Sequence, residues 1–458
     1  MTSTPLTSIS PLDGRYHHVT HELGAHVSEY ALIKTRTEIE ITYLLALSKA
    51  KVIRPIAIRE KRFLLGYLHA YNLEEALKVK SYEQTTRHDV KAVEKNLREM
   101  LKGTTLQDLI EFVHFGLTSE DVNNLSYRLM LQRATSQVII PYLNKLRQWL
   151  RALALEYKSV PMLARTHGQP AVPTTLGKEI AVFASRLNDQ LIQLESVRLT
   201  GKFAGAVGNF NAVALSHPQI DWITFSADYV RSLGLRPNQI TTQINSYDDV
   251  CEFLQIYQRI NSILIGLDQD IWRYISDGWF IQEVKKGEVG SSTMPQKVNP
   301  IDFENSEGNL GMANAVAEFF CRKLMISRLQ RDLSDSTTIR NIGTVLGYCL
   351  VGYKSILSGS TRIRPNTEKI KRDLHEEWSI LTEGVQTLLR KEGIEDPYSL
   401  VSSLSKGKHV GEKQWRLWVS KLKIGTTTKK RLVALNPDTY IGLAEQLTEK
   451  ALKKIPKR

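Results

Sequence analysis

The segment of this sequence best suited to chemistry is 278–304, which reads GWFIQEVKKGEVGSSTMPQKVNPIDFE. Its glycines and paired lysines predict an exposed, mobile loop between two long helices, and connections of about 20 residues are usually functional. Asn299 can cap the next helix, which would then have a proline in its first position and acids in its first turn. Ser291, Ser292 and Lys297 would therefore lie near a helix N-terminus, whose backbone N–H groups favour an anion.

Two histidines are candidates for proton transfer or for orienting a substrate. His167 lies in RTHGQPAVPTT at 165–175, a tight non-helical segment just before a long helix. Histidine is the usual general acid near neutral pH, although a single histidine is more often a structural hydrogen-bonding group. His88, in the sequence RHDV, is the competing candidate, and its context favours orienting the substrate or contacting its phosphate side over a direct proton transfer. Asp89 could orient His88 or accept a hydrogen bond from a ribose hydroxyl.

Hydroxyl side chains gather at two predicted helix starts. Thr118-Ser119 precedes two acids, a pattern typical of a helix N-terminus. Ser336-Thr337-Thr338 offers similar donors. Both sets could bind an anion through hydroxyl and N–H groups, while simple helix capping explains the first set equally well.

The elements that would position these residues are mostly helical. Apolar residues recur at helical spacing, and neither a βαβ alternation nor a phosphate-binding glycine pattern is present in the sequence. Pro141 should kink the first of five long helices rather than end it. Helices of this length imply a bundle, and their broad apolar faces favour association between chains. The expected helices are 28–50, 57–80, a run of about 40 residues from 118, one from 176 to about 194, 247–276, 300–329 and 338–360.

This pattern predicts an all-α protein with three helical domains. The boundaries fall in the 102–118 region and at Arg364-Pro365-Asn366. The expected domains are an N-terminal helical domain at 1–117, a central long-helix bundle at 118–364 and a basic C-terminal helical domain at 365–458.

The charge of the chain is unevenly distributed. The net charge is +13, of which residues 401–458 carry +10. A basic stretch of this kind is usually a solvated helical face, and a contact with a polyanion is the alternative. Three separated cysteines indicate neither a disulfide framework nor a zinc site, and the N-terminus resembles no secretory signal. We therefore expect a soluble cytoplasmic protein that binds no membrane, and the charge pattern disfavours nucleic acid as a partner.

Several motifs together resemble one enzyme family. GSSTMPQKVNP at 290–300 resembles the shared loop of the fumarase/aspartase superfamily, whose members are helical tetramers that eliminate fumarate from succinyl compounds. One departure is Gln296, where the family commonly has histidine, and what this change puts in doubt is the family's loop pairing or pH response rather than its activity. The segments that narrow the resemblance to the adenylosuccinate lyase family, in its longer bacterial form, are SPLDGRY at 10–16, TRHDVKAVE at 86–94, RTHGQPAVPTT at 165–175, TTQI at 241–244 and DSTTIRN at 335–341.

The resemblance implies a role for each matching residue. His167 would be the general acid and Ser291 the general base, although the sequence alone does not decide between Ser291 and Ser292. Arg15, Arg331 and Arg340 would bind the anionic groups of the substrate. The full set of implied substrate-binding residues is Arg15, Tyr16, His88, Asp89, Val90, Thr118, Ser119, Gln243, Ser292, Lys297, Val298, Asn299, Asn305, Arg331, Ser336, Thr337, Thr338, Ile339 and Arg340.

The resemblance also implies a reaction and an assembly. The reaction would be the cofactor-free release of fumarate from adenylosuccinate, giving AMP, and from the succinylated aminoimidazole carboxamide ribotide (SAICAR), giving AICAR. The sequence contains no metal-ligand spacing, Walker motif or HExxH. The assembly would be a homotetramer with twenty helices at its centre and active sites shared between subunits.

Two other readings remain open from the sequence. Sister enzymes such as argininosuccinate lyase, aspartase or fumarase share the 290–300 loop, but Arg15-Tyr16 and His88-Asp89 match the nucleotide-specific family. A catalytically inactive structural or RNA-binding protein would use the basic C-terminal stretch, and the intact candidate residues His167 and Ser291 argue against it.

Overall fold

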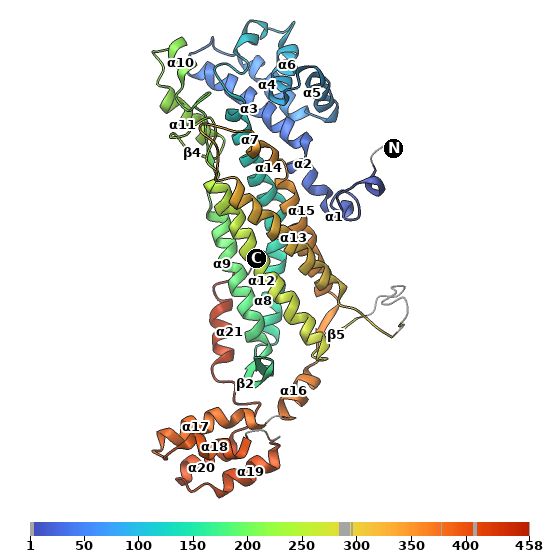
Figure 1. The fold of residues 1–458 in the computed structure, drawn as a ribbon, viewed down its shortest axis with the longest axis vertical. Helices are drawn as coiled ribbons and strands as arrows, with labels where there is room; N and C mark the ends of the chain where they lie inside the picture. Colours follow the sequence, from blue (N-terminus) through green and yellow to red (C-terminus); the bar gives the residue numbers. More distant parts are fainter. Residues whose placement is uncertain (1–3, 284–293, 295, 377, 406–409, 458) are drawn as a thin grey trace. The chain divides into compact units, whose positions relative to one another are not determined.

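The computed structural model describes residues 4–283, 294, 296–376, 378–405 and 410–457 (Figure 1). The chain forms two compact units, each assembled from three separate segments. Unit 1 consists of Met1–Leu143, Leu191–Ser262 and Gly308–Lys354. Unit 2 consists of Asn144–Gln190, Ile263–Glu307 and Ser355–Arg458. Several long helices contribute residues to both units. The division into domains at 117/118 and 364/365 stays a prediction.

Unit 1 contains the N-terminal helices and one part of each long helix. Within it α3 packs on α6 and α7, and α5 packs on α6. Its helices are α1 (His17–Thr20), α2 (Gly24–Val27), α3 (Glu29–Lys49), α4 (Ile58–Ala70), α5 (Leu73–Thr86), α6 (Asp89–Leu101), α7 (Ser119–Ala134), α10 (Asn211–Ser216), α11 (Trp222–Ser232) and α14 (Ser334–Ile339). Short 3-10 turns lie at Pro5–Thr7, His21–Leu23 and Gln107–Phe112, and the strands β3 (Thr200–Gly201) and β4 (Arg236–Pro237) pair in parallel.

Unit 2 contains the C-terminal helices and two antiparallel strand pairs. The strand β1 (Pro161–Thr166) pairs with β2 (Gln169–Thr175), and β5 (Phe280–Gln282) pairs with β6 (Ile363–Pro365). The hairpin is supported by α16, which packs on β1, and by α21, which packs on β2. The helices are α16 (Thr367–Glu376), a 3-10 turn (Trp378–Leu381), α17 (Thr382–Lys391), α18 (Pro397–Ser405), α19 (Glu412–Lys421), α20 (Thr426–Ala434) and α21 (Ala444–Leu452).

Long helices dominate the middle of the sequence, as predicted. On α12 the predicted apolar stripe is buried, from Val250 and Phe253 in unit 1 to Leu264 and Ile271 in unit 2. These side chains follow the 3.6-residue period that places them on one face. The elements that contribute to both units are α8 (Ile140–Glu156), α9 (Leu176–Ser196), α12 (Asp248–Ser276), α13 (Ile301–Lys323) and α15 (Ile342–Ser360).

Pro141 lies within a continuous helical run, so the helix does not end at this proline, as predicted. A π-helical turn at Thr135–Ile139 joins α7 to α8 directly before this proline. Proline lacks the N–H that an α-helix needs, and its ring crowds the preceding turn. A locally wider turn with shifted hydrogen bonding accommodates both effects, so the helix continues.

Three sequence-based boundaries were wrong. The expected helix at 57–80 is two helices, because Tyr71 leaves the helical conformation and the Asn72 side chain caps α5 by accepting from the Glu75 N–H at 3.2 Å. The helix expected to run to 329 ends at Lys323. Residues 280–282, expected within a loop, form β5 because β6 supplies a partner strand that lies far along the sequence.

Two further features are the cysteine side chains and the hydropathy of the helices. Cys251, Cys321 and Cys349 are buried free thiols. Within the described ranges, no helix combines the length and the apolar character that crossing a bilayer requires.

Candidate active site

The N-terminus of α7 is fixed by a capping box, as the sequence predicted. The Thr118 N–H donates to Asp121 Oδ2 at 2.9 Å. Asp121 is fully buried and also pairs with Lys202 at 2.7 Å, while its Oδ1 accepts from the Ala204 N–H at 2.9 Å. A buried carboxylate with this many partners is held rigidly. Ser119, the first helical residue, is therefore presented from a fixed helix end.

His88 is the N-cap of α6 and faces the start of α7. Its Nδ1 accepts from the Lys91 N–H at 3.2 Å, so in the neutral imidazole the proton lies on Nε2. Nε2 lies 3.4 Å from Ser119 Oγ. Half of the His88 side chain remains exposed, so the ring can also contact a bound molecule. The structure thus brings together His88 and Ser119, two of the predicted substrate-binding residues.

Asp89 joins two arginines from distant parts of unit 1. Its Oδ2 accepts from Arg36 at 2.8 Å and from Arg340 at 2.6 Å, while Oδ1 accepts from the Val90 N–H at 2.8 Å. Burial raises the cost of ionising Asp89, but the two guanidinium charges and the N–H outweigh it, so its pKa lies well below the usual range. We call Arg36, His88, Asp89, Ser119 and Arg340 the Asp89 cluster.

Arg331 contacts Gln243, a predicted substrate-binding residue, and Glu120, which the sequence analysis did not predict. It donates to Gln243 Oε1 at 3.0 Å and lies 3.5 Å from Glu120 Oε2. Burial raises the pKa of Glu120 to about 7, although the charge of Arg331 opposes this shift. Gln243 in turn donates to the Ala206 carbonyl at 2.9 Å. Because Glu120 and Ser119 are adjacent at the start of α7, Arg331 lies on the same helix end as the Asp89 cluster.

The short helix α14 carries the predicted hydroxyl run. Asp335 organises its first turn, accepting from the Ser336 N–H at 2.7 Å and from the Tyr247 hydroxyl at 3.2 Å. Thr337 is exposed, whereas Thr338 and Ile339 are buried. Val90 is buried as well. The Val90 and Ile339 side chains are thus part of the core, and only main-chain groups of these two residues could face a substrate.

Arg15 and Tyr16 lie on the turn that precedes α1. Close by, Leu12 packs against Gly347 of α15, and Lys354 of the same helix pairs with Glu22. The Arg15 side chain is exposed and has no ion-pair partner among the described residues. It is therefore free to meet an anion from solvent.

In unit 2, His167 occupies the tip of the β1–β2 hairpin. Thr166 pairs with Gln169, which leaves His167 and Gly168 as a two-residue turn with φ of +53° and +74°. Two consecutive positive φ values match the twist of the flanking strands. A non-glycine residue at positive φ is uncommon and often functional. The hairpin therefore projects an exposed imidazole, in agreement with the predicted tight non-helical segment.

Residues 296–305 lead into α13. The Val298 carbonyl accepts from Gln282 at 3.0 Å, while the Lys297 side chain is exposed. α13 begins at Ile301, so the proline lies one position before the first helical residue rather than at it. Asp302 and Glu304 lie in the first turn as predicted, and Asn305 donates to Ser355 of α15 at 2.7 Å. Ser291 and Ser292 lie outside the described residues.

Sequence reasoning missed the residues that hold these groups in place. Arg36 is 1% exposed on α3, yet it reaches Asp89 and also donates to Asn123 at 2.9 Å. A charged residue among the apolar positions of a helix is the signal that could have found it. Glu120 is likewise a buried charged residue, and it directly follows the predicted helix start at Thr118-Ser119. In the described part of the chain, no three histidine, cysteine or acidic side chains gather in a way that could hold a metal ion.

Two family patterns match most of the chain. Residues 14–316 match the family described as lyase, and residues 327–441 match the family described as adenylosuccinate lyase C-terminal. The first match includes the Asp89 cluster except for Arg340, together with the His167 hairpin. The second includes Arg331, Arg340 and α14.

Curated relatives match the chain along nearly its whole length. The adenylosuccinate lyase of Haemophilus influenzae is 46% identical over 98% of this chain and 100% of its own. The adenylosuccinate lyase of Vibrio cholerae is 44% identical over 98% of this chain and 100% of its own. That of Dictyostelium discoideum is 45% identical over 96% of this chain and 97% of its own.

Solved structures share the fold at low identity. A 3-carboxy-cis,cis-muconate lactonizing enzyme from Pseudomonas putida superposes with a TM-score of 0.72 at 19% identity, over 95% of this chain and 96% of its own. A fumarate lyase from Mesorhizobium sp. BNC1 gives 0.74 at 17% identity, over 95% and 97% of the two chains. At these identities the likeness establishes the all-α fold alone.

Proposed function

Because the chain belongs to the adenylosuccinate lyase family, we propose that it releases fumarate from adenylosuccinate, giving AMP, and from SAICAR, giving AICAR. The observation that carries this proposal is the similarity along nearly the full length of three relatives that bear this name. The Asp89 cluster supports it, because an exposed histidine, a serine and an arginine converge there at the ends of α6 and α7.

The reaction is a β-elimination in which a proton and an amine leave neighbouring carbons. A base removes the proton from the carbon beside a carboxylate, and the electron pair forms the new C=C bond as the C–N bond breaks. The intermediate is a doubly charged aci-carboxylate, so fixed positive charge and N–H donors are needed beside it. Lys297 and the start of α13 would supply these groups, since the ammonium is exposed next to a helix N-terminus.

His167 would be the general acid that protonates the leaving nitrogen. Its exposed position on a two-residue turn supports this role, because an imidazole there can reach a bound substrate while its backbone stays fixed by the hairpin. Ser291 would be the general base. A serine hydroxyl needs its anion stabilised, and closure of the 278–304 segment around Lys297 would provide a cation in a site that excludes water.

Arginines would capture the anionic groups of the substrate, which carries about four negative charges from one phosphate and two carboxylates. Arg340 is partly exposed, with one terminal nitrogen 2.6 Å from Asp89 and the other 3.5 Å from Glu29, so its guanidinium is oriented by two carboxylates at the edge of the cluster. Arg331 is oriented by Gln243 and Glu120. Arg15 is exposed on the turn before α1. Bidentate guanidinium groups suit both phosphate and carboxylate.

Sister lyases such as argininosuccinate lyase and fumarase are the alternative within the same superfamily. The neighbours Asp89 and His88 favour the nucleotide substrate, since a carboxylate can accept a hydrogen bond from a ribose hydroxyl and an imidazole N–H can donate one to a phosphate. The C-terminal family match at 327–441 carries the name adenylosuccinate lyase and points the same way.

The chain would assemble as a homotetramer with shared active sites. One face of α13 supports association, because it exposes Met312 and Phe319 beside the small residues Gly308, Gly311 and Ala315. These five positions share one side of the helix, and small residues allow another helix to approach closely. An exposed face of this kind in a long helix favours burial against a second chain.

Fumarate release tests the proposed reaction directly. The purified protein should convert adenylosuccinate and SAICAR with a matching change in ultraviolet absorbance, and should leave argininosuccinate and malate unchanged. Arg15→Ala, Arg331→Ala and Arg340→Ala should each raise KM and make it more sensitive to salt, because they remove anion contacts. Conversion of argininosuccinate or malate instead would mean that the chain has the activity of a sister enzyme.

Subunit mixing tests the shared site. Inactive His167→Ala and Ser291→Ala proteins, dissociated and reassembled together, should regain at most about a quarter of the wild-type activity if each site takes the two residues from different chains. A tagged-chain pull-down verifies the exchange. If mixed tetramers form and activity stays at the mutant level, the two residues belong to one chain.

The reaction would take place in the cytoplasm. The three buried cysteines are free thiols, which a reducing compartment preserves. Its partners would be small-molecule nucleotide substrates and other copies of the chain.

A further inference from the structure

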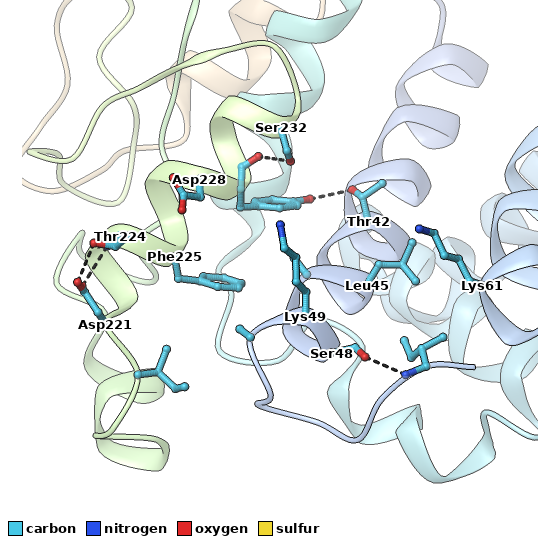
Figure 2. A pocket seen from close by; sticks show the side chains of 15 residues that line it. Thr42, Leu45, Ser48, Lys49, Lys61, Asp221, Thr224, Phe225, Asp228 and Ser232 are labelled. Atoms are coloured by element: carbon cyan, nitrogen blue, oxygen red, sulfur yellow. Dashed lines mark hydrogen bonds between the residues drawn. The ribbon is translucent and has the colours of Figure 1, made fainter. Parts of the chain in front are cut away.

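A cavity of about 690 Å³ lies in unit 1 between the C-terminal half of α3, the start of α4 and α11 (Figure 2). Its volume lies within the range of about 300–1,000 Å³ that holds small organic ligands. None of its lining residues belongs to the Asp89 cluster, to the Arg331 site or to the His167 hairpin. The proposed reaction therefore gives the cavity no role.

The cavity has an apolar surface with an aromatic side. Leu45 and Ala46 of α3 lie opposite Phe225 of α11, and Ile56 and Ile220 add further apolar surface from the segments before α4 and α11. Phe225 and Leu45 both face the space seen in Figure 2. Such a surface favours a ligand with a flat, largely apolar body, which would displace water from it.

The hydroxyl groups around the cavity are already bonded within the protein. Each serine, threonine and tyrosine side chain that lines it uses its hydroxyl in an intramolecular contact, and the contacts of Thr224 and Ser232 appear as dashed lines in Figure 2. The contacts are Thr42 to the Glu38 carbonyl at 2.8 Å, Ser48 to the Arg54 carbonyl at 3.0 Å, Thr224 to Asp221 at 2.7 Å, Tyr229 to the Ile39 carbonyl at 2.7 Å and Ser232 to the Tyr229 carbonyl at 2.6 Å.

The two carboxylates of the lining are also engaged. Asp221 caps α11, accepting from the Thr224 N–H at 3.1 Å as well as from its hydroxyl. Asp228 pairs with Arg231 at 2.8 Å. Neither Asp221 nor Asp228 forms an ion pair with Lys49 or Lys61.

Lys49 and Lys61 are the cations that remain. Within the described ranges, neither ammonium has a hydrogen bond or an ion pair. Lys49 lies in the last turn of α3, where the helix dipole favours a cation and accounts for its presence. Lys61 lies near the N-terminus of α4, where the same dipole disfavours it. Both lysines are exposed at the rim of the cavity, where their ammonium groups can meet an anion.

We propose that this cavity binds a nucleoside monophosphate, a small molecule with a flat ring and a phosphate group. The ring would lie against Phe225 and Leu45, and the phosphate would lie between Lys49 and Lys61. Lysine binds phosphate as a point charge, so two ammonium groups on separate helices suit a dianion. The inference does not depend on the reaction of the other site, because the two share no residue.

Photoaffinity labelling with 8-azido-AMP tests the proposal, because peptide mapping separates this cavity from any other site. The labelled wild-type protein is cut with a protease specific for glutamate, since the variants change lysines. Label is expected on residues within 42–61 or 220–232, located by sequencing the labelled peptides, because the glutamate-cleaved peptide that carries 220–232 runs from 196 to 252 and also contains Gln243 of the Arg331 site. Unlabelled AMP should compete, whereas adenosine and inorganic phosphate should compete about tenfold less well, since each lacks one half of the ligand.

Matched variants then assign the phosphate contact. The double variant Lys49→Gln/Lys61→Gln should lose about tenfold or more of the label at these peptides, and Lys49→Arg/Lys61→Arg should retain it. Arg59→Gln/Arg62→Gln removes the same charge from exposed positions of α4 that do not line the cavity, and should label like wild type. Fumarate release by the lysine variants should be unchanged.

Three results would overturn the proposal. The first is wild-type protein with no label at 42–61 or 220–232. The second is equal labelling in Lys49→Gln/Lys61→Gln and wild type. The third is inorganic phosphate competing as well as AMP, which would mean that an anion is bound without its ring. In each case normal fumarate release would leave the proposed reaction intact.

Discussion

The Asp89 cluster and the His167 hairpin differ in how their functional side chains are held. Asp89 is fixed by two guanidinium groups and a backbone N–H, and Arg36 behind it is buried. His167 is exposed, and its placement comes from the turn that carries it, with positive φ at two successive residues. Charge in the cluster is thus positioned by opposite charge, whereas the imidazole is positioned by the backbone.

This difference teaches that binding and proton transfer place different demands on a fold. An arginine that must stay oriented needs a carboxylate partner, because a desolvated charge without one is unstable. A general acid must meet its substrate without competing partners, so an exposed turn suits it. Variants can therefore separate effects on turnover from effects on stability.

The largest effect should come from His167→Asn. Asparagine tolerates positive φ, so the hairpin should survive, but its amide cannot donate a proton near neutral pH. We expect turnover to fall by about 10²–10⁴-fold with little change in KM. Steady-state fumarate release measures both. His69→Asn, at another exposed histidine on α4, should retain wild-type turnover. A His167→Asn enzyme within a few-fold of wild type would exclude His167 as the acid.

Removal of Asp89 and removal of Arg340 should lower the free energy of unfolding by different amounts. Asp89→Ala leaves Arg36 buried without its carboxylate and should lower the free energy of unfolding by about 3 kcal/mol. Arg340→Ala removes a partly exposed partner and should cost about 1 kcal/mol or less. Urea unfolding of both variants gives the comparison. Equal losses would mean that burial does not determine the strength of these contacts.

Glu120 should make stability depend on pH in the direction opposite to Asp89. Its pKa is raised by burial to about 7, so the folded state binds the proton more tightly than the unfolded chain. Its contribution is complete below the ordinary glutamate pKa and is lost as pH rises through about 7. Asp89, whose pKa is lowered, contributes stability at pH values above the ordinary aspartate pKa. This contribution is lost at acid pH, as the carboxylate becomes protonated.

The variant Glu120→Gln isolates this effect. Between pH 5 and pH 8, the free energy of unfolding of wild type should decrease by about 2 kcal/mol more than that of Glu120→Gln. Glu252→Gln, at an exposed position of α12, should keep the wild-type pH profile. Parallel profiles for Glu120→Gln and wild type would show that Glu120 is ionised throughout this range.

The smallest effect should come from the hairpin backbone. A Cβ at Gly168 would meet no atom within 4 Å, so Gly168→Ala has no clash and only the strain of φ at +74°. We expect about 1 kcal/mol of local destabilisation, measured as faster amide exchange in β1 and β2. Gly66→Ala, within α4 and also without a clash, should instead stabilise its helix by about 0.5–1 kcal/mol. Unchanged exchange at Gly168→Ala would mean that the turn does not require glycine.

The sequence alone determined the long helices and the chemistry-bearing segments. The apolar period of 3.6 residues located α3, α9 and α12 to within a few residues, because that period is a property of the helix itself. The hydroxyl and acid at 118–121 located the start of α7, because a capping box is complete within four residues. The family resemblance then singled out His167 and the 290–300 segment as candidates for the reaction.

Tertiary structure decided what each charged group contacts. Arg36, Asp89 and Arg340 meet across 53 and 251 residues of sequence, which no local pattern encodes. The raised pKa of Glu120 likewise depends on burial beside residues that are distant in sequence. Local elements follow from short-range periodicity and capping, whereas ion pairs and pKa values follow from burial, and burial exists only once the helices have packed.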